Sequence, residues 1–140
     1  MKSHFSKHWK SSRQVRKQRK YQYNAPLHVK HKFLSSNLSK ALREKYSKRS
    51  LPLRKGDEVL VMRGTFSKKK GKIVSVNLKQ AKVAIEGLQR QKKDGTKVNV
   101  FFHPSVLQIH SLNLDDKYRV QALTRKSSSK AESQSKETVK

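Results

Sequence analysis

The sequence contains no cysteine, few acidic residues and no long apolar run. Without thiols the chain forms no disulfide, carries no thiolate nucleophile and binds no zinc through cysteine, a composition that suits a reducing compartment. No apolar segment approaches the roughly 20 residues that a membrane-spanning helix requires. We therefore expect neither disulfide stabilisation nor membrane insertion.

The first ten residues, MKSHFSKHWK, lack the apolar segment of a secretory signal, although their start is basic. A mitochondrial transit peptide stays open as an alternative, because these residues are basic and contain serine. The positive charge continues beyond residue 50, which favours a segment of the mature protein.

Motifs of catalysis and metal binding are missing as well. The chain has no G-x-S-x-G, no phosphate-binding P-loop and no dinucleotide fingerprint. The close carboxylate pairs at residues 57–58 and 115–116 lie at the starts of expected elements, where turn and cap chemistry accounts for them. His28 and His31 have the spacing of a helical metal site but no third ligand nearby. We predict no enzymatic activity, cofactor, metal or small-molecule substrate.

What the chain has in excess is positive charge. Lysine and arginine number 35 against 9 acidic residues, giving a net charge of +26, and only 33% of the residues are hydrophobic. So few apolar residues favour a compact module of roughly 60–80 residues with polar extensions. Residues 1–50 contain 15 basic residues and one acidic residue. This distribution favours binding to a polyanion, with an arm that becomes ordered on a nucleic acid.

Residues 1–24 are expected to form this flexible basic arm, because basic residues recur too densely to leave an apolar stripe. Phe5, Trp9, Tyr21 and Tyr23 are interleaved with the basic residues. Such a mixture neutralises phosphates and stacks on bases or sugars, which favours RNA binding over a merely solvated tail.

Residues 25–52 predict two short helices. A proline marks the start of the first helix. In the second helix Leu38, Leu42 and Tyr46 recur at helical spacing after an expected N-cap at residue 36 or 37. This helix packs one side and presents charge on the others.

The spacing of the hydrophobic residues changes from helical to strand-like between residues 53 and 112, where short β-branched and aromatic runs are separated by glycines. The expected strands are residues 57–62, 72–76, 81–86, 97–102 and 106–110. Five strands in about sixty residues favour a small, strongly bent β-barrel. Asp94-Gly95 predicts a hairpin with a type I′ turn. The residues assigned to packing are Val59, Val61, Ile73, Val83, Ile85 and Val100.

Residues 113–140 predict a short helix followed by a flexible tail. Asp115 and Asp116 suit the first turn of this helix and Arg125 suits its last. The segment from residue 126 to the end is rich in serine, lysine and glutamate and has no hydrophobic period, so we expect it to be disordered.

Basic residues also gather at two expected turns of the barrel. The first turn lies at residues 63–72 and contains three consecutive lysines, and the second surrounds Asp94-Gly95. Each phosphate contact releases counterions, so affinity for a nucleic acid is expected to fall steeply with salt. The predicted RNA-binding residues are Arg13, Arg16, Lys17, Arg19, Lys20, Tyr21, Lys30, His31, Lys32, Arg49, Arg54, Lys55, Arg63, Lys68, Lys69, Lys70, Lys72, Lys92 and Lys93.

The stretch GDEVLVMRGTFSKKKGKIVSVNLKQAKVAIEG resembles a KOW motif, with a strand ending in Arg-Gly, a basic turn, and Gly-Lys leading into a second strand. Upstream, NAPLHV and LSKALREKY, and downstream, HPS and LNLDD, resemble the universal L-twenty-four family of large-subunit ribosomal proteins, in its archaeal and eukaryotic branch. The resemblance covers roughly residues 13–125.

This resemblance implies an SH3-like barrel with an extended N-terminal part and a location in the large ribosomal subunit of the cytoplasm. It also implies binding to large-subunit rRNA near its 5′ domain, early in assembly and near the polypeptide exit tunnel. Neighbouring large-subunit proteins and exit-tunnel factors are the further partners implied. Relatives usually have glycine where this chain has Lys68, and often an acidic residue at Lys70, so the path of this turn does not carry over from the family.

Two alternatives come from other classes. A KOW module of a transcription elongation factor would bind polymerase or nascent RNA, but it gives no reason for the basic segment of fifty residues. A basic protein that coats anionic membranes would need an amphipathic helix with bulky apolar anchors. The expected helices contain few such anchors.

Overall fold

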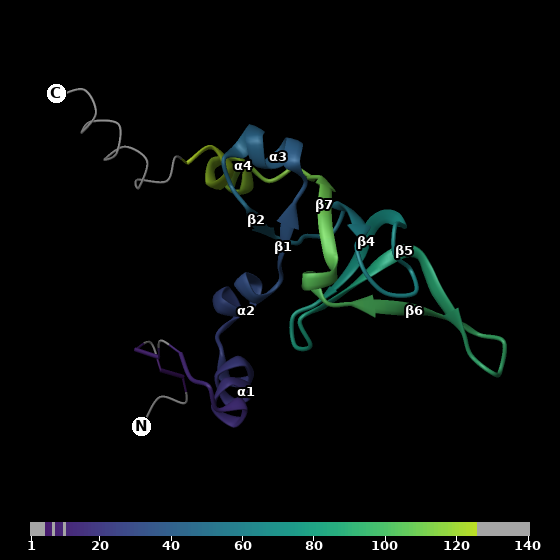
Figure 1. The fold of residues 1–140 in the computed structure, drawn as a ribbon, viewed down its shortest axis with the longest axis horizontal. Coiled ribbons are helices and arrows are strands. Elements are labelled where there is room, and N and C mark those ends of the chain that lie inside the picture. The colour runs from purple at the N-terminus through teal and green to yellow at the C-terminus, as the bar shows by residue number, and fades with distance from the viewer. Residues whose placement is uncertain (1–4, 7, 10, 126–140) are drawn as a thin grey trace.

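The computed structural model describes residues 5–6, 8–9 and 11–125 (Figure 1). The strands are β1 (Ser35–Leu38), β2 (Ser50–Pro52), β3 (Glu58–Val61), β4 (Lys70–Asn77), β5 (Lys82–Gln91), β6 (Lys97–Phe102) and β7 (Leu107–Ser111). The helices are α1 (Val15–Asn24), α2 (Leu27–Phe33), α3 (Lys40–Tyr46) and α4 (Lys117–Thr124), with a 3-10 turn at Pro104–Val106. This arrangement confirms a mainly β fold with short helices before and after the main strands.

The seven strands form one mixed sheet in the order β2-β1-β7-β3-β4-β5-β6. Each of β3 to β7 matches one of the five expected strands. The first of them, β3, pairs with the last, β7, as well as with β4, and this pairing bends the sheet into a barrel-like unit. Register shifts in the β3–β7, β4–β5 and β5–β6 pairs increase the bend, as β-bulges do. In Figure 1 the β5–β6 hairpin projects away from this unit.

The inward positions of these strands form a single core. Of the residues assigned to packing, five are almost completely buried and Val100 packs against them from a partly buried position. Ala84 is buried as well, although strict alternation along β5 would place it outside. Ala84 lies next to register shifts in the pairing of β5 with both β4 and β6.

The segment expected to contain only two helices also contains β1 and β2. Ser36 and Leu38 alternate inward on β1, which pairs antiparallel with β2 and parallel with β7. The expected N-cap at residue 36 or 37 is therefore wrong, because these residues belong to a strand. The N-cap of α3 is Ser39, whose side chain accepts a hydrogen bond from the backbone of Leu42.

The arm expected to be flexible contains helix α1. None of its residues is buried, and a helix of ten residues is marginal on its own in water. An aromatic cluster stabilises it: the ring of Tyr21 stacks on Trp9 at 4.2 Å and lies 4.9 Å from Phe5 and 6.2 Å from Phe33. Phe33 belongs to α2, so this cluster also joins the two helices.

The β5–β6 hairpin is confirmed, but its turn is not type I′. The backbone nitrogen of Gly95 donates to Lys92 at 3.1 Å, and that of Lys92 donates to Thr96 at 2.9 Å. Gly95 has φ +85°. Asp94 is not among the residues of positive φ, whereas a type I′ turn requires positive φ at both central residues. Its carboxylate accepts hydrogen bonds from both the backbone and the hydroxyl of Thr96. These bonds lower the pKa of Asp94.

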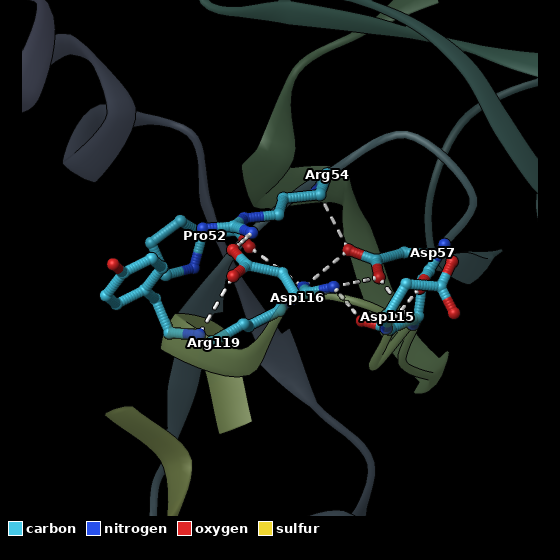
Figure 2. Close-up of polar contacts among 8 residues, drawn as sticks. Pro52, Arg54, Asp57, Asp115, Asp116 and Arg119 are labelled. Atoms are coloured by element: carbon cyan, nitrogen blue, oxygen red, sulfur yellow. Dashed lines mark hydrogen bonds and ion pairs between the residues drawn. The ribbon is translucent and has the colours of Figure 1, made fainter. Parts of the chain in front are cut away.

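A buried ion pair connects α4 to the sheet (Figure 2). Asp57, which is fully buried, precedes β3, and Arg119 on α4 is only 4% exposed. Nη1 and Nη2 of Arg119 donate to the two carboxylate oxygens at 2.6 and 2.7 Å. The same carboxylate accepts from the backbone nitrogens of Arg54 and Asn113, at 2.8 and 3.0 Å. Arg119 also donates to two backbone carbonyls, so both charges are fully hydrogen-bonded.

Removing one member of this pair should destabilise the fold strongly. Arg119→Met leaves the carboxylate of Asp57 buried without its counter-ion, and we expect the free energy of unfolding to fall by about 3–5 kcal/mol. Urea denaturation followed by circular dichroism measures this change. Arg125→Met, at an exposed position just after α4, is the control. A loss no larger than that of the control would contradict the assignment.

Candidate nucleic-acid interface

The predicted RNA-binding residues lie at the surface in five groups, and all are exposed except Tyr21 and Lys30, which are partly buried. The α1 group consists of Arg13, Arg16, Lys17, Arg19, Lys20 and Tyr21, and the α2 group of Lys30, His31 and Lys32. The turn cluster consists of Arg63, Lys68, Lys69, Lys70 and Lys72, and the hairpin cluster of Lys92 and Lys93. Arg49, Arg54 and Lys55 flank β2.

The turn cluster is displayed on an ordered turn between β3 and β4. The backbone nitrogen of Lys68 donates to Val61 at 2.7 Å, and that of Val61 donates to Lys69 at 2.9 Å. Phe66 anchors the turn, because its ring meets Phe102 edge-on at 5.8 Å. Nζ of Lys69 lies 5.3 Å from the Phe66 ring centroid, in cation–π range.

The glycine after the three lysines is required by packing. A Cβ at Gly71 would come within 2.6 Å of the side chain of Ile85 and 3.0 Å of the carbonyl oxygen of Glu86. Strands β4 and β5 therefore approach closely where the turn cluster ends, and only glycine leaves enough room.

Lys68 has a backbone conformation that favours glycine, with φ +66°. The turn therefore accommodates lysine in the left-handed region. A side chain there costs roughly 1–2 kcal/mol, because Cβ crowds the following carbonyl.

We expect Lys68→Gly to raise the free energy of unfolding by up to about 1 kcal/mol, since relief of this strain exceeds the entropy that glycine loses on folding. Lys69→Gly, which removes the same charge at a neighbouring position without positive φ, should instead lower stability. Parallel urea denaturation of the two variants measures the difference. Equal effects would show that the backbone of residue 68 is not strained.

Most of these cations have no acidic partner. Within the described residues, the ion pairs are Arg119–Asp57 and Arg54–Asp116. Glu58 lies opposite Lys72 in the β3–β4 register without forming an ion pair. The turn cluster, the hairpin cluster and the α1 group therefore keep their charge available to a polyanion.

Arg54 is the exception among the predicted residues. Its guanidinium donates to the carboxylate of Asp116, which is also the N-cap of α4 and accepts from the backbone of Tyr118 at 2.8 Å (Figure 2). The expectation that Asp116 lies in the first turn is therefore wrong by one position. The hydrogen bond from Arg54, followed by that from Tyr118, lowers the pKa of Asp116 below its ordinary value of 3.8.

The pKa of Asp116 should rise toward 3.8 in Arg54→Met, because the largest cause of its depression is removed. A depressed native pKa stabilises the fold above the unfolded value, and this contribution is lost as the pH falls through the native pKa. Carboxyl-carbon NMR titration from about pH 6 to about pH 2 measures the midpoint. Lys55→Met, at the neighbouring exposed cation, should leave the midpoint unchanged; an equal rise in that variant would contradict the pairing.

Tyr21 and Tyr23 differ in how available their rings are. The ring of Tyr21 is engaged in the aromatic cluster, whereas Tyr23 is 76% exposed at the end of α1. Tyr23, whose ring is exposed, is one of the aromatic residues noted in the arm, but it is not among the predicted RNA-binding residues.

Arg119 was missed by the sequence analysis for a different reason, because nothing in the local sequence distinguishes a buried arginine from a surface one.

The fold and this surface define the class of protein: a small, strongly basic β-domain protein with a helical N-terminal extension. Within residues 5–6, 8–9 and 11–125, no helix is both long and apolar enough to cross a membrane. In the same part of the chain, no group of three or more histidine, aspartate or glutamate side chains is placed to hold a metal ion.

Comparison with known proteins identifies the particular family. Residues 12–126 match the family described as the ribosomal proteins L26 of eukaryotes and their archaeal L24 counterparts. The large ribosomal subunit protein uL24 of Methanosphaera stadtmanae is 47% identical over 115 residues, covering 82% of this chain and 98% of the relative. That of Korarchaeum cryptofilum is 47% identical over 110 residues, covering 79% and 84%. The chain belongs to this family of ribosomal proteins, a non-enzymatic family of the cytoplasmic ribosome.

Proposed function

We propose that this protein is a structural component of the large ribosomal subunit and binds large-subunit rRNA through its exposed cations. The observation that carries the proposal is the turn cluster, whose lysines stand on an ordered turn without acidic partners among the described residues. The names of the two archaeal relatives, large ribosomal subunit proteins, support the same assignment.

Binding of this kind divides into two contributions. Lysine and arginine contacts to phosphates position the protein and release counterions, which makes affinity strongly dependent on salt. The shape of the folded rRNA supplies specificity, because double-stranded RNA is recognised mostly by shape and backbone. The α1 and α2 groups lie on the helical extension and the turn and hairpin clusters on the sheet, so the protein would contact several rRNA segments at once.

The finer assignments rest on the family resemblance. They place the binding site near the 5′ domain of the rRNA, give the protein a role early in subunit assembly, and locate it near the polypeptide exit tunnel. Neighbouring large-subunit proteins would be its protein partners, and exit-tunnel factors would approach it there. The family match extends through α1, α2, the whole sheet and α4, which supports this reading over a KOW module of an elongation factor.

Replacing Lys68, Lys69 and Lys70 together with alanine tests the role of the turn cluster. If each lysine contacts a phosphate, the slope of log affinity for large-subunit rRNA against log salt should become shallower by about 2 to 3. The wild type should co-sediment with large subunits through a high-salt wash that removes the variant. Circular dichroism checks that the fold is intact, because none of these side chains is buried.

The matched control replaces Lys40, Lys45 and Lys117 with alanine. These lysines are also exposed, and their replacement removes the same charge from outside the proposed interface. Equal slopes in the two triple variants would show that net charge alone governs binding. Recovery of the wild type only with RNA polymerase, and not with large subunits, would refute the proposed function and favour the elongation-factor alternative.

A further inference from the structure

A groove of about 400 Å³ opens between the helical extension and the sheet. Three segments that are distant in the sequence border it: helices α1 and α2, the β4–β5 turn, and the junction after β6. The side chains that matter here are Arg19, Tyr23, Lys30, Phe33, Lys79 and His103. The volume falls in the range of small-ligand sites, roughly 300–1,000 Å³.

The lining combines aromatic rings with cations and contains no carboxylate among the described residues. Tyr23 is 76% exposed, so its ring face is open to a ligand, while Phe33 is partly buried at the end of α2. Arg19, Lys30 and Lys79 come from three different elements and surround these rings. Aromatic faces next to cations are the combination that binds an unstacked base together with its phosphate.

His103, which also lines the groove, adds a hydrogen-bonding group. Its Nδ1 lies 2.9 Å from the hydroxyl oxygen of Ser105 and accepts from the backbone nitrogen of Ser105 at 3.3 Å. With Nδ1 acting as an acceptor, the proton of the neutral ring is on Nε2, which can donate to a base carbonyl or a phosphate oxygen.

The β4–β5 turn that closes the groove is strained. Ala81 has φ +51°, although it is not glycine, and the backbone nitrogen of Gln80 donates to the side-chain oxygen of Asn77 at 3.1 Å. Residues held in sparsely populated backbone regions concentrate at ligand sites.

We propose that this groove binds a single unstacked RNA nucleotide. The base stacks on Tyr23 against the apolar surface contributed by Phe33, and the cations of the groove pair with the adjoining phosphates. This site rests on the proposed function, because it would hold one nucleotide of the rRNA that the basic surface binds. It adds recognition of a base to an interface otherwise made of phosphate contacts.

Two fluorescein-labelled RNA decamers test the site with the full-length protein: decauridine, and an abasic decamer that has the same phosphates but no bases. Fluorescence anisotropy measures the affinity of each. The wild type should prefer decauridine, and Tyr23→Ala should reduce this preference by about 5- to 150-fold, the range expected for one stacked base. Tyr23→Phe keeps the ring and should retain the preference.

Tyr118→Ala is the matched control, because Tyr118 is 80% exposed on α4 and does not line the groove. Photo-crosslinking of a 4-thiouridine decamer, mapped by mass spectrometry, should label Tyr23 or Phe33. An unchanged preference in Tyr23→Ala, or crosslinks confined to residues outside the groove, would overturn the nucleotide site while leaving rRNA binding intact. Failure of the wild type to bind large-subunit rRNA at all would instead refute the proposed function.

Discussion

The arrangement of this protein depends on the buried pair between Asp57 and Arg119. A carboxylate without access to water is stable only when its charge is matched and its oxygens are hydrogen-bonded, and here four donors meet that requirement. These donors come from the loop after β2, the segment after β7, and α4. Their geometry is satisfied only when all three segments meet at the start of β3. The pair therefore determines where α4 and the entrance to the barrel-like unit lie.

The contacts of the carboxylates also determine which cations stay unpaired at the surface. Asp57 is buried and pairs with Arg119, and Asp116 both caps α4 and pairs with Arg54. With these acidic groups committed to internal contacts, the turn cluster and the α1 group face solvent without acidic partners among the described residues. Their mutual repulsion is tolerated because the backbone of the β3–β4 turn is fixed by hydrogen bonds and anchored through Phe66. A surface of this kind is preorganised for phosphates.

Local sequence predicted the five strands from β3 to β7 because their period of two and their glycines act over a few residues. The same reasoning missed β1, which is a strand because Ser36 pairs with Leu51 of β2 and Leu38 pairs with Ile109 of β7, some seventy positions away. It also misjudged the hairpin turn. Asp-Gly favours type I′, but Asp94 is not among the residues of positive φ, and its carboxylate accepts two hydrogen bonds from Thr96. For the candidate interface, the exposure of the basic residues followed from their charge, whereas the engagement of Tyr21 in a ring cluster required its neighbours in space.

The sequence by itself determined the charge, the absence of thiol chemistry and the pattern of the main strands, because these depend on composition and on neighbouring residues. Tertiary structure decided what depends on distant ones. It buried Arg119 against Asp57, held Lys68 in a conformation suited to glycine, and brought Tyr23 together with His103 beside one groove. Each of these outcomes depends on contacts that form only when the chain folds, and the pattern of the sequence does not show which residues will meet.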